Sequence, residues 1–168
     1  MFTKIDPKEI DGNVFQRIGE QWMLITAGDQ NACNTMTASW GGLGVLWNQP
    51  VATIYVRPQR YTKKFVDAEK YFSLTFFDKE YRRELALCGS KSGRDIDKVK
   101  ECNFTVEYGF GGTPYFAQAE LVLICEKQYS DWIKPECFHD QETNERCYPE
   151  KDWHEFYIGK IVEVLKKT

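Results

Sequence analysis

The stretch VATIYVRPQRYTKKF, residues Val51–Phe65, joins the pattern of a β-strand to a cluster of positive charge. In its first half Ala52, Ile54 and Val56 occupy alternate positions, and a period of two predicts a strand with one buried face. In its second half four lysine and arginine side chains fall within eight positions of a chain whose net charge is −3. The stretch therefore predicts a strand that ends at a local positive charge.

The same alternation recurs along the chain and decides the fold class. YFSLTFF (Tyr71–Phe77) repeats it. Further strands are predicted at Met23–Ala27, Met36–Leu46, Phe104–Tyr108, Tyr115–Tyr129 and Trp153–Leu165. The last two are long, and Gly159 would permit a bend. Short helices are predicted at Thr62–Glu69, with Thr62 as its cap, at Lys79–Leu87 and at Asp95–Cys102. We expect one mainly β domain over residues 1–168, an antiparallel barrel with a few peripheral helices.

Composition excludes several classes of protein. No run of apolar residues is long enough to span a membrane, and the first residues lack the apolar segment of a signal peptide. The six cysteines are therefore expected to be reduced thiols in the cytoplasm. The mildly acidic balance, with a pI near 5.5, does not favour nucleic acid as a partner. Cys137, His139 and Cys147 lack the paired spacing of structural zinc sites, so no metal is predicted.

Three stretches carry candidate binding chemistry. In RPQRYT the guanidinium groups of Arg57 and Arg60, next to a helix start, suit a phosphomonoester; the alternative is an exposed basic turn. In NTMTASWGGLGVLWNQP (Asn34–Pro50) small hydroxyl residues, a tryptophan and glycines suit a planar heterocycle; the alternative is an ordinary glycine-rich barrel strand. In CGSKSGRDIDKVKE (Cys88–Glu101) a polar loop suits an anion or hydroxyl groups; the alternative is a flexible connector.

Taken in order, these motifs resemble a known family. The sequence N-T-M-T-A-S-W-G-G-L-G, then R-P-Q-R-Y-T, then S-G-R-D-x-D-K, and finally H-E-F-Y-I-G-K-I is similar to the flavin reductase-like proteins with the FMN-binding split β-barrel, an antiparallel, Greek-key-like fold. The flavoredoxin branch is the most similar. The resemblance runs from about Trp22 to Val164.

The resemblance implies one FMN per subunit of a homodimer, near the subunit interface, and it implies the residues that bind it. The flavin ring would lie along Asn34, Thr35, Met36, Thr37, Ala38, Ser39 and Trp40. The phosphate would bind Arg57, Arg60, Tyr61 and Thr62, and Ser92, Gly93 and Lys98 would close over the ribityl–phosphate side.

His154 matches the family's histidine near the open face of the flavin, where it would be the catalytic residue that positions a nicotinamide or a proton. The alternative is an ordinary hydrogen-bonded strand histidine. Two features depart from the family pattern. Lys160 stands where an acidic residue is common, and the long polar insert Lys134–Trp153 could cover the flavin.

Two functions follow from this resemblance. The first is NAD(P)H-dependent reduction of a flavin, in which the cofactor itself accepts the electrons. The second is a flavoredoxin-like carrier with permanently bound FMN, which passes electrons between protein partners and has no nicotinamide substrate of its own. The chain has no G-x-G-x-x-G between a strand and a helix, so a Rossmann site for the nicotinamide nucleotide is not predicted. A module that holds haem is disfavoured, because only His139 and His154 could ligate it.

Overall fold

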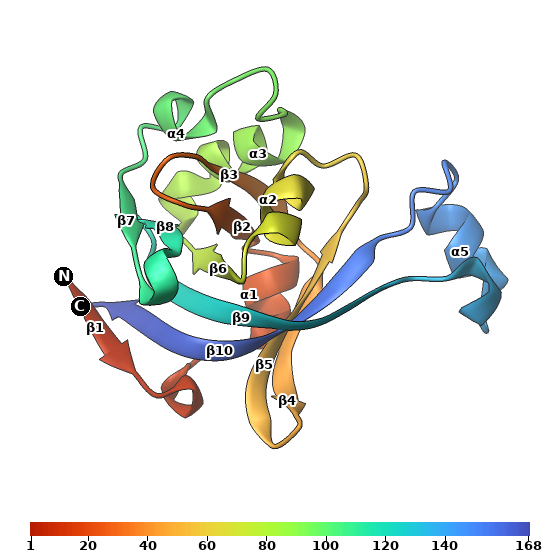
Figure 1. Cartoon of the computed structure of the whole chain (residues 1–168), viewed down its shortest axis with the longest axis horizontal. Coiled ribbons are helices and arrows are strands. Elements are labelled where there is room, and N and C mark those ends of the chain that lie inside the picture. Colours follow the sequence, from red (N-terminus) through yellow and green to blue (C-terminus); the bar gives the residue numbers. More distant parts are fainter.

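A computed structural model describes residues 1–168, and it shows a mainly antiparallel β fold. Eight strands form one curved sheet in the order β3-β2-β6-β9-β10-β5-β4, with β1 paired to β10 (Figure 1). These strands are β1 (Phe2–Ile5), β2 (Met23–Gly28), β3 (Cys33–Ala38), β4 (Gly41–Leu46), β5 (Gln49–Val56), β6 (Tyr71–Phe76), β9 (Leu121–Trp132) and β10 (Glu155–Lys167). The short strands β7 (Val106–Tyr108) and β8 (Pro114–Phe116) pair separately.

The burial of the strands follows the alternation of the sequence. In β5 the side chains of Ala52, Ile54 and Val56 are buried, while Thr53 and Tyr55 are half-buried, as the period of two predicts. β6 lies between β2 and β9 and is buried on both faces, because one face lines the barrel and β8 packs against the other. The hydroxyl group of Ser73 on this strand accordingly donates to the carbonyl of Pro114.

Two predicted strands are each divided in two. Met36–Leu46 was expected as one strand, but β3 and β4 are separated by Ser39 and Trp40. These two strands lie at opposite ends of the strand order, so a two-residue link of about 11 Å brings the sheet edges together and curls the sheet. Tyr115–Tyr129 is likewise divided into β8 and β9 by a turn at Ala117–Glu120, where the amide of Ala119 donates to the carbonyl of Phe116.

The long strands β9 and β10 bend where the sequence allows. Their register shifts between Ile158 and Gly159, and again between Ile161 and Glu163. A Cβ atom on Gly159 would lie 2.7 Å from Cζ of Phe72 and 2.8 Å from Cβ of Cys125. The predicted bend at Gly159 is confirmed, and the glycine is also required because a buried ring approaches the backbone there.

The helices are short and lie around the sheet. They are α1 (Val14–Gly19), α2 (Thr62–Ala68), α3 (Arg82–Ser90), α4 (Lys98–Glu101) and α5 (Gln141–Cys147), with 3-10 turns at Pro7–Glu9, Lys79–Tyr81, Phe110–Gly112 and Pro135–Cys137. The sequence did not predict α1 or α5, and the expected helix Asp95–Cys102 is only one turn long. None of these helices combines the length and the apolar character that a membrane crossing needs.

The prediction that Thr62 caps its helix is wrong. Tyr61, which precedes the first helical residue, has a helical backbone and makes no side-chain cap. The Thr62 hydroxyl group instead accepts a hydrogen bond of 2.8 Å from Nδ2 of Asn34, which joins the start of α2 to β3. A tertiary partner has therefore replaced the local cap.

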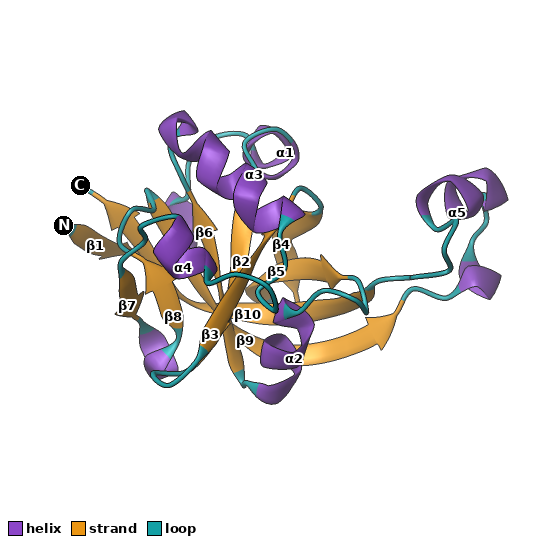
Figure 2. Ribbon diagram, turned by 90° about the horizontal axis from the view of Figure 1, so that it is seen from above, coloured by secondary structure: helices purple, strands orange, loops and turns teal.

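Two clusters of buried side chains hold the elements together. The larger one fills the barrel interior, where Ile25, Leu74 and Tyr157 from three different strands meet. The second packs α3 and the loop before β7 against the outer face, through residues such as Leu85, Phe104 and Phe116. The insert stands apart from both: α5 lies beyond the far ends of β9 and β10 in both views (Figures 1 and 2).

Candidate functional site

A small polar cavity lies between the start of α2 and the end of α3. Its volume is about 130 Å³. It is lined by Gln59, Arg60, Tyr61, Thr62, Gly89, Ser90, Lys91, Ser92 and Lys98. No carboxylate lines it, although it contains two side chains whose cationic groups are largely removed from water. Such a cavity has the charge and size of an anion site.

Arg60 is the more unusual of the two cations. Its Nη1 donates to the carbonyl of Gly89 at 2.9 Å, but its Nη2 is enclosed and has no hydrogen-bond partner. Burial lowers the pKa of the guanidinium; the Cys88 thiol opposes this effect less strongly, and no carboxylate offsets it. An enclosed donor without a partner is costly, so the geometry fits a group that supplies acceptor oxygens.

Lys98 reaches the same cavity from α4. Its Nζ donates to the carbonyls of Thr35 and Cys88, each at 2.8 Å, so the side chain ties β3 to the end of α3. Burial, together with the charge of Arg60, lowers the pKa of Lys98 to about 8. An ammonium group has three donors, and the third is free for a ligand in the cavity.

Arg57 lies elsewhere, although the resemblance places it with Arg60. Its Nη1 is 2.8 Å from Oδ1 of Asp152, and its Nη2 donates to the carbonyl of Cys147 at 3.1 Å. The guanidinium also stacks near the rings of Trp40 and Tyr148. The charge of Arg57 is therefore balanced by Asp152, and Arg57 joins the base of the insert to β5.

Four side chains of β3 are occupied by contacts within the protein. Met36 and Ala38 point into the barrel core. The hydroxyl groups of Thr35 and Thr26 are hydrogen-bonded to each other across the sheet, and the Thr37 hydroxyl group donates to the carbonyl of Leu85. A ligand that lies along the strand could therefore contact these four residues only through their backbone. This agrees with the expectation that the strand would bind a flavin ring through backbone groups.

Asn34 stands at the other end of the same strand, beside the loop of Gly93. A Cβ atom on Gly93 would lie 2.1 Å from Oδ1 of Asn34 and 2.9 Å from Tyr61. These three residues line a second cavity of about 520 Å³, which also includes Thr35 and Lys98. The cavity shares Tyr61 and Lys98 with the anion cavity, so the two cavities are neighbours.

Ser39 and Trp40 open onto a third hollow, a groove of about 690 Å³ between α1 and β4. Its walls include Phe15, Tyr55 and Tyr148, and none of its lining side chains is charged. His154 stands behind it, with its ring 5.3 Å from that of Trp40. The β5–β10 register pairs Val56 with Glu155, so Arg57 and His154 lie at the same end of the two strands.

His154 is held by the insert. Its Nδ1 lies 2.7 Å from Oη of Tyr148, and burial, with the nearby charge of Arg57, lowers the pKa of the imidazole to about 4. Tyr148, Asp152 and Gly89 are site residues that the sequence did not predict. Only the short separation of Tyr148 and His154 in the sequence hinted at a contact.

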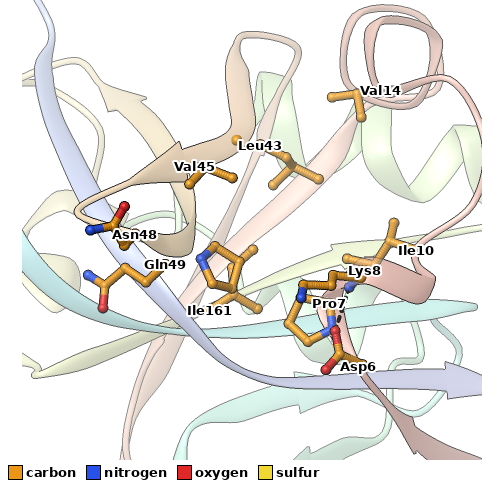
Figure 3. A pocket seen from close by; sticks show the side chains of 12 residues that line it. Asp6, Pro7, Lys8, Ile10, Val14, Leu43, Val45, Asn48, Gln49 and Ile161 are labelled. Carbon is orange, nitrogen blue, oxygen red and sulfur yellow. Dashed lines mark hydrogen bonds between the residues drawn. The ribbon is translucent and has the colours of Figure 1, made fainter.

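A further cavity, of about 440 Å³, adjoins the groove beside Trp40, since Val14 and Leu43 line both. Figure 3 shows Pro7, Ile10, Leu43 and Val45 around it, between the N-terminal segment and the β4–β5 hairpin. It contains no enclosed donor without a partner and is mostly apolar in character. Elsewhere, no three His, Cys, Asp or Glu side chains are grouped as metal ligands.

The curled antiparallel sheet, with cavities along the edge at β3, defines a protein of the split-barrel class. A model of the flavin reductase like domain matches residues 15–168. The chain therefore belongs to the flavin reductase-like family. Among curated proteins, no sequence matches this chain.

Several solved structures share the fold of this chain. Flavoredoxin from Methanosarcina acetivorans has a TM-score of 0.68 and 22% identity, over 88% of this chain and 68% of that one. An FMN-binding protein from Thermus thermophilus has a TM-score of 0.69 and 18% identity, over 97% of this chain and 81% of that one. An NADH:FAD oxidoreductase from Streptomyces globisporus has a TM-score of 0.64 and 15% identity, over 88% of this chain and 74% of that one. At these identities the likeness concerns the fold.

Proposed function

We propose that the chain is a single FMN-binding domain that carries out redox chemistry through the bound flavin. One observation carries the proposal: Arg60, whose Nη2 is enclosed without a partner, lines a cavity together with Lys98, and no acid lines it. A phosphomonoester, with its doubly charged group of acceptor oxygens, would satisfy both cations. FMN ends in such a group, whereas riboflavin does not.

The remaining residues would then hold the cofactor in an ordered way. Thr62 and the loop Gly89–Ser92 would surround the phosphate, and Asn34, Tyr61 and Gly93 would enclose the ribityl side. The ring would lie along the backbone of Thr35–Trp40, with His154 near its open face. Bound flavin supplies the electron acceptance, and the chain supplies orientation and electrostatics.

Two activities fit this arrangement, NAD(P)H-dependent flavin reduction and electron transfer from a protein donor. One observation favours the second: the groove beside Trp40 has no charged lining residue, and Arg57 behind it is paired with Asp152. A nicotinamide nucleotide carries phosphates and would find no counterion there. An electron carrier needs only an accessible flavin edge.

The chain is also proposed to form a homodimer. The β4 strand is an end of the sheet, and the hairpin that it begins exposes Val45 and Trp47, with exposed fractions of 80% and 53%. Trp47 has φ 53°, a conformation that a bulky side chain rarely adopts. A second copy that covers this hairpin would bury apolar surface and pair a free edge.

The test begins with the purified protein. We expect it to be yellow, or to take up FMN in a one-to-one ratio when FMN is added to the colourless form. Anaerobic addition of NADH and then NADPH separates the two activities: rapid bleaching supports a reductase, whereas bleaching only by dithionite or a protein donor supports a carrier. A protein that binds no FMN at any concentration rules out the proposal.

A further inference from the structure

The end of the insert makes a direct contact with His154. Tyr148, the residue after α5, places its Oη 2.7 Å from Nδ1 of the imidazole. Each side chain is more than nine-tenths buried. This is the one side-chain hydrogen bond that either residue makes, so it alone orients the two polar groups relative to each other.

The direction of this hydrogen bond follows from the available partners. If Nδ1 carried the proton and donated it, the Tyr148 hydroxyl would need another acceptor, and none is within reach. A hydroxyl group of a largely buried residue is unfavourable when the protein offers it no acceptor. Tyr148 therefore donates to Nδ1, and the proton of the neutral imidazole lies on Nε2.

Burial and the charge of Arg57 keep the imidazole neutral. Tyr55 faces it from β5, Arg57 from just after β5, Asp152 from the segment before β10, and Tyr148 from just after α5. Burial and the positive charge of Arg57 both oppose protonation, and Asp152 favours it less strongly. The pKa of His154 falls to about 4, so the ring is neutral at pH 7.

Nε2 is the atom of His154 that remains available. It makes no hydrogen bond within the chain, and it is not among the enclosed side-chain nitrogen and oxygen atoms that lack a hydrogen bond. Nε2 is therefore reached by solvent, close to the ring of Trp40 at the end of the proposed flavin site. A neutral N–H donor is thus presented there.

We infer that Tyr148 is a positioning residue, which holds His154 as the neutral tautomer protonated on Nε2 and so presents a hydrogen-bond donor to a carbonyl or ring nitrogen of the bound flavin. The flavin part of this inference rests on the proposed function; the tautomer does not. The insert thereby takes part in the site through one hydroxyl group, besides lengthening the β9–β10 connection. No proton is transferred in this role.

The test uses the full chain labelled with ¹⁵N at histidine. Only His139 and His154 are present, so two sets of ring signals are expected, and His139 serves as the internal control. In the wild type we expect His154 to show a single neutral tautomer, with Nε2 protonated and Nδ1 accepting, down to about pH 5. Adding FMN should shift the Nε2 signal and leave that of His139 unchanged.

The decisive variant is Tyr148→Phe, which keeps the ring and removes the hydroxyl. We expect His154 to populate both tautomers in this variant, with circular dichroism as the check of folding. Tyr55→Phe is the matched control, because its ring is 6.2 Å from that of His154 and shares no hydrogen bond with it. The control should keep the wild-type tautomer.

Two results would overturn the inference: a wild-type His154 protonated on Nδ1, or a Tyr148→Phe variant with the unchanged single tautomer. If Tyr148→Phe does not fold, the wild-type tautomer still decides the direction of the hydrogen bond. A protein that takes up no FMN contradicts the proposed function, and the tautomer of His154 then remains a separate result.

Discussion

Arg57 and Asp152, 95 positions apart in the sequence, form an ion pair in which Nη1 lies 2.8 Å from Oδ1. The pair ties the end of β5 to the end of the insert. It also explains why two arginines of one short motif differ: Asp152 balances the charge of Arg57, whereas Arg60 is enclosed beside a second cation. The two arginines should therefore respond differently to substitution.

Replacing Arg60 with methionine should weaken the binding of FMN and hardly affect that of riboflavin. The change removes a charge-assisted hydrogen bond of about 1.5–3 kcal/mol, which corresponds to roughly ten- to a hundredfold in affinity. Arg57→Met is the matched control and should change both affinities by similar factors. Fluorescence titration with each flavin measures this difference, and an equal loss for both ligands in Arg60→Met would refute the assignment of the phosphate cavity.

The affinity for FMN should fall as the pH rises through about 8. Below this pH Lys98 is charged and can bind the phosphate, and above it the lysine becomes neutral. The stability of the flavin-free protein should change in the opposite sense. Because the pKa of Lys98 is lowered on folding from 10.5 to about 8, the unfolded chain holds more protons between these values, and this group favours folding increasingly as the pH rises.

Lys98→Met provides the control for both parts of this pH dependence. Titrations with FMN between pH 6.5 and 9.5 should lose the component centred near pH 8, and urea unfolding over the same range should lose the rise in stability that begins near pH 8. A wild-type affinity that stays constant across this range contradicts a role of Lys98 in binding the phosphate.

Gly159→Ala should destabilise the protein by about 1–3 kcal/mol, as is typical when a group is forced into a packed core. The added methyl group would meet the ring of Phe72 and the side chain of Cys125, both buried. Gly44→Ala on β4 is the control, since a Cβ atom there has no neighbour within 4 Å. Thermal unfolding of both variants tests this, at about 2–4 °C per kcal/mol for a chain of this size.

Trp47→Glu at the tip of the β4–β5 hairpin should convert the proposed dimer to monomer. The substitution places a charge where apolar surface would be buried between copies, and a buried unpaired charge is strongly unfavourable. Tyr108→Glu, an exposed aromatic residue on the separate β7–β8 sheet, should leave the assembly unchanged. Light scattering over a range of concentrations, with and without FMN, gives the result. A wild type that is monomeric throughout rules out the dimer.

The sequence by itself determined the strands whose two faces differ and the positions of the binding motifs. Ala52, Ile54 and Val56 alternate with less buried residues, so their strand could be predicted from the period alone. The mainly β class was predicted for the same reason. The motifs from Asn34 to His154, in their order along the chain, also indicated the family, because the spacing of such residues is a local property that the sequence states directly.

Only the tertiary structure decided which cations share a cavity and what orients His154. Arg57 and Arg60 are three residues apart, yet Asp152 pairs with one and Lys98 lies beside the other. The Tyr148 contact likewise depends on how the insert returns to β10. These relationships join segments far apart in the sequence, and their electrostatics depend on burial. Since neither distance nor burial is encoded in a local pattern, the fold had to bring the groups together before their chemistry could be assigned.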